Sequence, residues 1–173
     1  LPREIKGAML SCILSDTLHF RSPTTTPHDR AVAEALAAGL GVSIPDLAAA
    51  QFEAKSDVSA FSDAALLRMD SKEYTVAGKE LRISVLETTA PKVILDRKAS
   101  LMASAEDVAR EDGADQVMLF VIDILREEAT LLVPNDFVAR VAEASFGVTV
   151  SGDTVVIPGL MSRKKQILPA LRV

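Results

Sequence analysis

The first third of the chain is predicted to be helical. Residues 2–20 carry apolar side chains on most sides of a helical projection, so we expect a helix that packs against partners on more than one side. The apolar positions are Met9, Leu10, Ile13, Leu14 and Leu18. A chain that opens on such a helix, with no leading strand or polar cap, suggests a segment of a longer protein.

Two further helices are indicated by their capping residues. Thr26 is predicted to cap a helix with Pro27 at its first position, and this helix should end near Gly39 and Gly41. Ser43 is expected to cap a shorter third helix. These helices would precede the following domain and belong elsewhere.

The pattern changes after the polar segment 53–59, which is the best candidate for a linker. Beyond it, strand-length apolar runs alternate with helical patterns, as in an α/β domain with a mixed β-sheet flanked by helices. The run at 117–124 is apolar almost throughout, as expected for a central strand buried on both faces. The predicted elements are helices at 62–67, 93–111 and 136–145, a hairpin of 74–76 with 81–85, a strand at 131–133, and a hairpin of 148–150 with 154–157.

Composition narrows the class of protein. With 173 residues, 49% of them apolar, the chain is long enough for one full core. A net charge of −5 argues against a general nucleic-acid binder, because phosphate neutralisation needs a broad basic face. No apolar run approaches the roughly 20 residues that span a bilayer, and the single cysteine excludes an internal disulfide. We therefore expect a cytoplasmic protein without a membrane partner.

Asp16 is the first candidate for chemistry. It follows Ile13 by three positions and precedes Phe20 by four, so on a helix it would lie on or beside the apolar face. An unpaired carboxylate is costly to bury, so a cation, backbone donors or a metal ion should compensate it. The alternative is that Asp16 ends the helix and caps the next turn together with Ser15 and Thr17.

A basic triplet near the end of the chain is the second candidate. Arg163, Lys164 and Lys165 follow a predicted strand and precede the apolar segment 167–169, which would hold the triplet on both sides. Arginine matches phosphate oxygens with a planar fork and lysine supplies a compact charge. The alternative is a solvated surface loop. Periodicity does not decide which two of the three cations act together.

Two further positions stand at the ends of predicted elements. Lys72 lies where a helix gives way to a strand, a place where ligand-facing residues often collect, and the alternative is an exposed pair with Asp70 or Glu73. Asp123 is expected to form a turn rather than to act in catalysis. The two histidines are too scattered to build a metal site, and there is no glycine loop of the kind that binds phosphate.

Three segments resemble one known family. They are ILSDTLHFRSPTTT at 13–26, DSKEY at 70–74, and SRKKQ at 162–166 with Pro169. Together they are similar to the manganese-dependent (family II) inorganic pyrophosphatases of the DHH phosphoesterase superfamily. The likeness covers nearly the whole chain, and SRKKQ is its most specific part.

The resemblance implies a two-domain enzyme that hydrolyses pyrophosphate to two phosphates. In the family a dinuclear Mn²⁺ or Co²⁺ centre is held mainly by HxN, DxD and DHH motifs, none of which occurs here, and Mg²⁺ can accompany the substrate. The resemblance makes Asp16 a metal ligand and Lys72, Arg163 and Lys164 substrate-binding cations; Lys165 is a weaker candidate. The isolated chain should then be inactive, because most metal ligands are missing.

The resemblance also assigns the domains. Residues 1–55 would be the last helices of a truncated DHH domain, with a linker to about residue 61, and residues 62–173 the C-terminal substrate-binding domain. The full-length protein could be a homodimer. Ser84-Val85 and Pro134 depart from the family pattern, which expects Gln and Gly at these places, so substrate preference stays open.

Two alternatives to pyrophosphate hydrolysis remain. The first is an exopolyphosphatase or nucleotide phosphoesterase of the same superfamily, whose members tend to keep SRK without the full SRKKQ. The second is a non-catalytic anion-binding or regulatory module.

Overall fold

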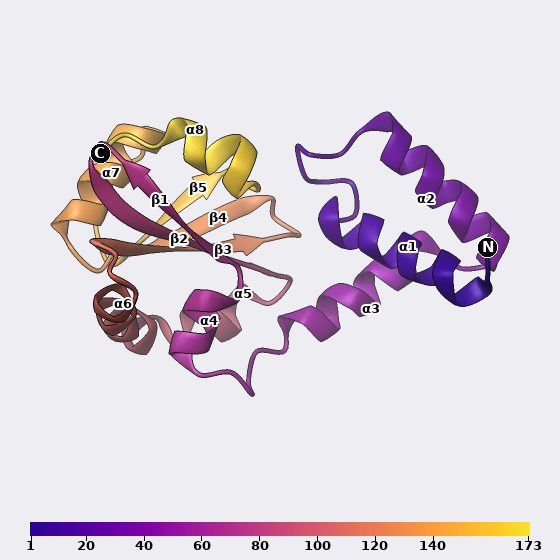
Figure 1. The fold of residues 1–173 in the computed structure, drawn as a ribbon, viewed down its shortest axis with the longest axis horizontal. Coiled ribbons are helices and arrows are strands. Elements are labelled where there is room, and N and C mark those ends of the chain that lie inside the picture. Colours follow the sequence, from indigo (N-terminus) through magenta and orange to yellow (C-terminus); the bar gives the residue numbers. More distant parts are fainter. The chain divides into compact units, whose positions relative to one another are not determined.

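The computed structural model describes all 173 residues, which form two compact units, Leu1–Asp57 and Val58–Val173. The first unit contains three helices, α1 (Arg3–Asp16), α2 (Pro27–Leu40) and α3 (Ile44–Ser56) (Figure 1). Leu10 and Leu14 of α1 are fully buried in this unit. Helix α1 is shorter than the predicted helix 2–20. Helix α3 includes about half of the predicted linker 53–59.

The predicted caps are confirmed. The Thr26 hydroxyl accepts a hydrogen bond from the backbone N–H of Asp29, whose carboxylate accepts from the N–H of Thr26, so that α2 begins with a reciprocal capping box. Gly41 ends α2 at φ 69°, a left-handed conformation that glycine adopts without strain, whereas Gly39 lies inside the helix. Ser43 caps α3.

No single helix is long and apolar enough to cross a bilayer. Helices α2 and α3 taken together are long and apolar enough, but the chain bends by 100° at the break between them.

The second unit is built on a five-stranded mixed sheet with the strand order β1-β2-β3-β4-β5. Strands β2 and β3 are parallel, and the other neighbouring pairs are antiparallel. The predicted α/β class is thus confirmed. The strands are β1 (Ser71–Val76), β2 (Lys79–Thr88), β3 (Gln116–Asp123), β4 (Glu128–Leu132) and β5 (Thr154–Pro158). The helices are α4 (Asp63–Met69), α5 (Pro91–Leu95), α6 (Lys98–Asp112), α7 (Asp136–Phe146), the π-helical turn η1 (Arg163–Ile167) and the short α8 (Leu168–Ala170).

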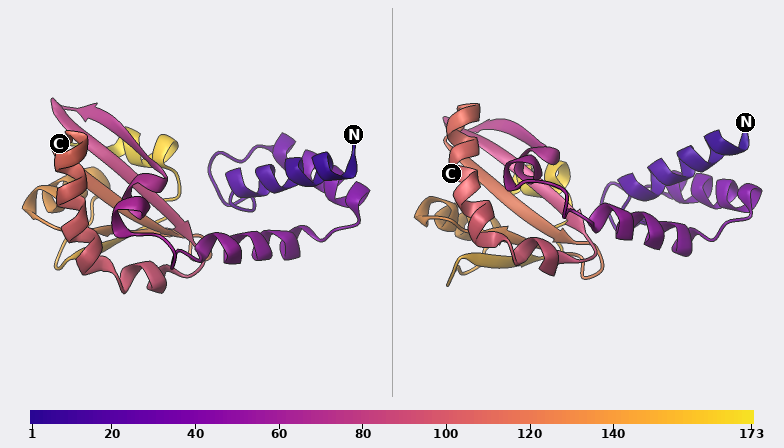
Figure 2. Two further views of the ribbon diagram at one scale, coloured as in Figure 1. Left: turned by 60° about the horizontal axis from the view of Figure 1, so that its bottom comes forward. Right: turned by 90° about the horizontal axis from the view of Figure 1, so that it is seen from below.

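Helices cover both faces of the sheet. Side chains of α4, α5 and α6 pack on one face against Val117, Leu119 and Val121 of β3. The other face carries α7, whose Phe146 meets Phe120 of β3 edge-on at 5.9 Å between ring centroids. Figures 1 and 2 show α4 and α6 on one side of the sheet and α7 and α8 on the other. Every residue of β3 is buried, which confirms the predicted central strand.

Two predicted elements are wrong. The helix expected at 93–111 is interrupted at Asp96 and Arg97, where the Arg97 guanidinium donates to the Phe61 carbonyl and the Asp63 carboxylate at 2.9 and 2.6 Å. The segment 148–150 is not a strand: Val150 donates its N–H to a Glu143 side-chain oxygen, and β5 pairs with β4 instead.

Asp123 forms a turn, as predicted. Its Oδ1 accepts hydrogen bonds from the backbone N–H groups of Leu125 and Arg126 at 2.9 and 3.1 Å, directly after β3. A carboxylate in this role satisfies two backbone donors that the strand leaves unpaired.

A network of charges fixes β1 and β2 to the helices on one face. Arg82 of β2 donates to Asp112 of α6 at 2.8 Å and to the Ser71 hydroxyl at 2.6 Å, and it also pairs with Glu73. Arg82 and Asp112 have side chains only 13% and 18% exposed. The pKa of Asp112 is held below its ordinary value, chiefly by hydrogen bonds from the Arg68 guanidinium and also by Arg82. Through Arg82, the network therefore links β1 and β2 to α6.

We predict that Arg82→Met lowers the free energy of unfolding by about 1–3 kcal/mol, because the mostly buried Asp112 loses a charged donor. The loss should shrink in acid: a carboxylate whose pKa is lowered on folding stabilises the protein above its unfolded pKa, and this contribution disappears as the pH falls through the folded value. Urea titrations at pH 7 and pH 3 measure both effects.

Lys79→Met is the matched control on the same strand. Lys79 pairs with Asp115 at 3.3 Å, but both side chains are roughly half exposed, so the change should leave the free energy of unfolding nearly unchanged. Equal losses for the two variants at pH 7 would contradict the assigned role of Arg82.

Candidate functional site

The SRKKQ segment is folded into a fixed turn. The Ser162 hydroxyl accepts from the backbone N–H of Lys165, and Oε1 of Gln166 accepts from the N–H groups of Met161 and Ser162 at 2.8 and 2.9 Å. Ile167, which follows, is fully buried. The turn is π-helical, so the alternation expected of a strand does not apply to its cations.

Arg163 is held against the residue that precedes β1. Its Nη2 lies 2.8 Å from Oδ1 of Asp70, and its Nη1 donates to the backbone carbonyl of Asp70 at 2.8 Å. The same carbonyl accepts a hydrogen bond from Val85 N–H of β2 at 2.9 Å. The Arg163 side chain is only 16% exposed. A mostly buried guanidinium with two fixed bonds is oriented before any ligand arrives.

Lys72 stands two residues after Asp70, on the side of β1 opposite the charge network. Its Cα pairs with Ile83, whereas Glu73 pairs with Arg82, and neighbouring residues of a strand point to opposite faces. An extended chain places Cα atoms two residues apart at about 6–7 Å. The structure thus brings Arg163 to the start of the strand that carries Lys72. Both Lys72 and Lys164 are exposed.

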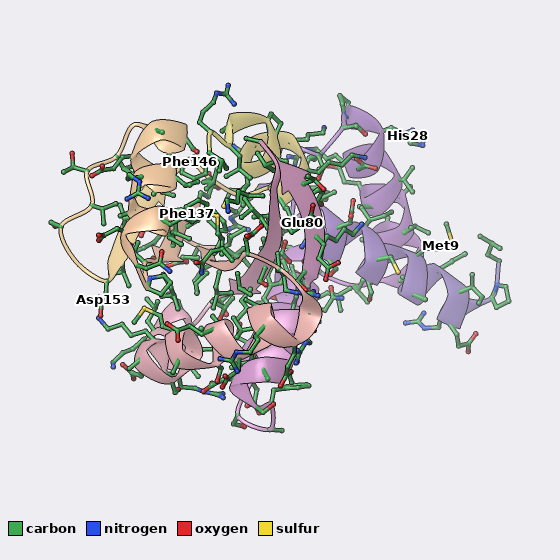
Figure 3. All side chains as sticks on the ribbon, turned by 60° about the vertical axis from the view of Figure 1, so that its left-hand side comes forward. Met9, His28, Glu80, Phe137, Phe146 and Asp153 are labelled. Carbon is green, nitrogen blue, oxygen red and sulfur yellow. The ribbon has the colours of Figure 1, made fainter.

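Asp16 is the last residue of α1 and belongs to the other unit. Its side chain is exposed, which corrects the expectation of a buried position, because the buried face of α1 is formed by Leu10 and Leu14. The exposed side also carries apolar residues. Ile5, Met9 and Cys12 are exposed and share with Asp16 the spacing of one helical face, and Met9 is visible there in Figure 3.

The turn after Asp16 is strained, and sequence reasoning missed it. Leu18, His19 and Phe20 all have positive φ, from 49° to 66°, which costs a residue with a side chain roughly 1–2 kcal/mol. Thr17 offsets this cost. Its hydroxyl donates to the Ile13 carbonyl at 2.7 Å and accepts from the Phe20 N–H at 3.2 Å. The sequence gives no signal for three consecutive left-handed residues.

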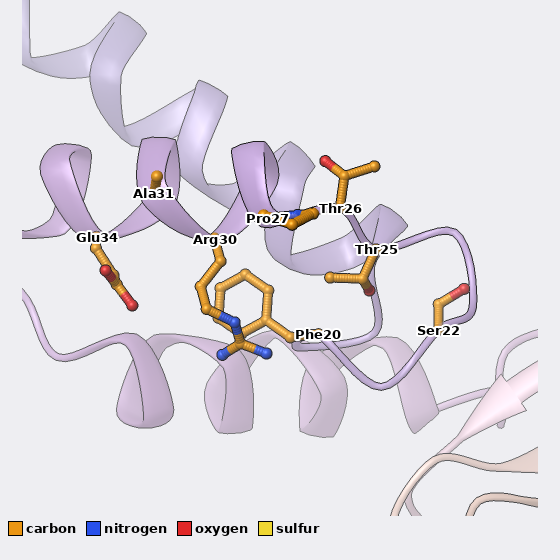
Figure 4. Close-up of a pocket in the computed structure, with 8 residues that line it drawn as sticks. All are labelled: Phe20, Ser22, Thr25, Thr26, Pro27, Arg30, Ala31 and Glu34. Atoms are coloured by element: carbon orange, nitrogen blue, oxygen red, sulfur yellow. The ribbon is translucent and has the colours of Figure 1, made fainter.

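A pocket of about 540 Å³ lies between this turn and α2 (Figure 4). The Arg30 guanidinium stacks over the Phe20 ring, 4.4 Å from its centroid. Burial lowers the pKa of the nearby His19, and the charges of Arg21 and Arg30 lower it further. The neutral imidazole is favoured, so that its Nδ1 can accept a hydrogen bond from Arg21 at 3.3 Å.

The chain holds one candidate metal ligand and no complete metal site. No group of three or more His, Cys, Asp and Glu side chains is placed to bind an ion. The Asp16 carboxylate is a hard oxygen donor of the kind that suits Mn²⁺, and it forms no hydrogen bond or ion pair within its unit. It fits one position of a metal centre whose other ligands would lie elsewhere.

Comparison with known proteins decides the family. The sequence profile of the DHHA2 domain matches residues 49–173, which include β1, η1 and the contact between Arg163 and Asp70. The chain belongs to the DHHA2 domain family. The profile therefore covers all of the second unit and most of α3.

Relatives of this DHHA2 protein include named pyrophosphatases. It is 41% identical to the "Probable manganese-dependent inorganic pyrophosphatase" of Deinococcus radiodurans and 35% identical to the "Manganese-dependent inorganic pyrophosphatase" of Bacillus subtilis. These alignments cover 98% and 99% of this chain and 55% of each relative. The chain thus spans about half the length of the curated relatives it matches.

A solved structure gives the same result. The DHHA2 protein superposes with a TM-score of 0.86 on a Methanococcus jannaschii crystal structure described as a candidate family II inorganic pyrophosphatase, at 32% identity. The match covers 98% of this chain and 55% of that one.

We predict that Thr17→Val lowers the free energy of unfolding of the first unit by about 1–3 kcal/mol, because the strained turn loses two hydrogen bonds and the Phe20 N–H loses its acceptor. Thr25→Val is the control, since the Thr25 hydroxyl reaches only the Thr17 carbonyl at the long distance of 3.5 Å. Urea unfolding followed by circular dichroism compares them. If Thr25→Val lowers the free energy of unfolding as much as Thr17→Val does, Thr17 is not the residue that stabilises the turn.

Proposed function

We propose that this chain is the C-terminal part of a cytoplasmic enzyme that hydrolyses pyrophosphate to two phosphates with a dinuclear Mn²⁺ centre. In this proposal Asp16 supplies one metal ligand, and Arg163, Lys164 and Lys72 bind the substrate. The observation that carries it is the bond between Arg163 and the residue preceding β1, which orients a mostly buried guanidinium near the strand of Lys72. The names of the relatives support the same activity.

The residue types suit the reaction. Hydrolysis of a phosphoanhydride spreads negative charge over the transferred and leaving phosphates, and fixed cations stabilise that charge. The Arg163 guanidinium offers a fork to two phosphate oxygens, whereas Lys72 and Lys164 act as point charges. When bound, Mn²⁺ supplies positive charge that activates water for attack at phosphorus.

The exposed face of α1 supports the proposed truncation. Ile5, Met9 and Cys12 would remain in water in an isolated helical unit, at a cost in apolar surface. If α1–α3 are the last helices of a DHH domain, the preceding part of the protein would cover these side chains. The carboxylate of Asp16, on the same helical face, would then stand at that contact rather than in solvent. In this proposal residues 1–55 belong to the DHH domain.

We predict that the 173-residue chain with Mn²⁺ releases no phosphate from pyrophosphate above background but binds imidodiphosphate, a non-hydrolysable analogue. Arg163→Ala should weaken this binding at least tenfold, because the pre-oriented guanidinium of the proposed site is lost. Isothermal titration calorimetry measures the affinity. The control is Arg110→Ala, which removes an exposed arginine that pairs only with Asp107. Turnover by the isolated chain would contradict the domain assignment. An unchanged imidodiphosphate affinity in Arg163→Ala would contradict the proposed role of Arg163 in substrate binding.

We further predict that Asp16→Asn in the full-length enzyme lowers Mn²⁺ affinity at least tenfold and lowers kcat, because a neutral amide is a poorer ligand than a carboxylate. Asp46→Asn, in the exposed first turn of α3, is the control of equal charge change. Mn²⁺ titration by calorimetry reads the affinity independently of activity. Equal Mn²⁺ affinities for the two variants would exclude Asp16 as a ligand.

A further inference from the structure

Arg163 already has an anionic partner, and the two bonds to that partner differ in kind. The Asp70 carbonyl is fixed, because it also accepts from Val85 N–H in the pairing of the first two strands. The Asp70 carboxylate is free to move by comparison, since its side chain is 55% exposed. One bond can therefore persist while the other is exchanged.

We propose that Asp70 is the resident counter-anion of Arg163. It is a positioning residue that neutralises the guanidinium while no ligand is bound, and it gives up the Nη2 donor to a phosphate oxygen when the ligand arrives. This inference rests on the proposed function, because it specifies how the same anion clamp is kept ready and how tightly it binds.

Burial explains why Arg163 needs a counter-anion. A guanidinium that is only 16% exposed has lost most of its hydration, and an unpaired charge in that position is costly. The Asp70 carboxylate offsets this cost at 2.8 Å. Arginine has five N–H donors, of which the structure uses one on the carbonyl and one on the carboxylate. The remaining donors can contact a ligand while the carbonyl bond keeps the fork in place.

The same carboxylate must oppose a bound phosphate. Once a phosphate oxygen takes its place at Nη2, the Asp70 charge remains within a few ångströms of a ligand of the same sign, and like charges at this range repel. Removing the charge while keeping an acceptor oxygen should therefore strengthen anion binding. Because Asp70 is half exposed, solvent screens the repulsion, and we expect a gain of about five- to tenfold.

This exchange would also act on product release. Substrate and products of the proposed reaction are all phosphate anions, so a carboxylate that returns to Arg163 competes with the retained phosphate. In the full-length enzyme Asp70→Asn should lower both KM for pyrophosphate and the inhibition constant of phosphate by about five- to tenfold without raising kcat. A purely structural role for Asp70 would leave these constants unchanged or raise KM.

The binding test uses the 173-residue chain and calorimetric titration with imidodiphosphate and with inorganic phosphate. Asp70→Asn should bind both about five- to tenfold more tightly, because the amide oxygen can still accept from Arg163 but carries no charge. Asp96→Asn is the matched control: it removes the same charge from an exposed pair with Lys92, and affinity should change less than about twofold. In an Arg163→Ala background, Asp70→Asn should give no gain, as expected when one residue acts through the other.

The outcomes separate the two proposals. If Arg163→Ala weakens anion binding but Asp70→Asn leaves it equal or weaker, the clamp stands and the counter-anion role fails. If no binding depends on Arg163, the proposed function fails and this inference fails with it. A gain that persists in the Arg163→Ala background would show that Asp70 acts only as a general negative charge, which also overturns the proposal.

Discussion

The backbone carbonyl of Asp70 is the point on which the candidate anion site depends. It accepts one hydrogen bond from Val85 of β2 and another from Arg163, which lies 93 positions further along the chain. The first bond extends the pairing of β1 and β2 by one residue, and the second attaches the π-helical turn to that extension. A displacement of β1 would therefore move the guanidinium together with the strand that carries Lys72.

One face of β1 carries a charge network, and the other carries the lysine that is proposed to bind substrate. On one face Ser71 and Glu73 contact Arg82, which is held in turn by Asp112 of α6. On the other face Lys72 stays exposed and makes no ion pair. Neighbouring residues of β1 point to opposite faces. The charge network on the α4–α6 face therefore restrains the strand that carries Lys72, although it does not contact Lys72. The stability of β1 and the position of Lys72 are thus linked, because both faces belong to the same strand.

Local signals predicted local structure well. Capping residues such as Thr26 and Ser43 act within three positions of themselves, and an unbroken apolar run such as 117–124 has few alternatives to a central strand. One error coincides with a distant contact. The helical pattern is interrupted at Arg97, whose side-chain partners Phe61 and Asp63 lie more than 30 residues away. Hydrophobic periodicity along the sequence does not reveal such distant partners.

The candidate site shows the same division. The family resemblance of SRKKQ implied an anion clamp and the sequence placed Lys72 at an element boundary, but Asp70 entered only as one alternative partner of that lysine. It pairs instead with Arg163, across a sequence separation that no local pattern reports. A net charge of −5 does not by itself exclude the proposed local anion site. Exposed charges more than a Debye length of about 8–10 Å away are largely screened, so the field at the site is set by the groups in contact with it. In the proposed site, the mostly buried Arg163 guanidinium would therefore outweigh the more distant acidic surface once Asp70 has given up its Nη2 donor.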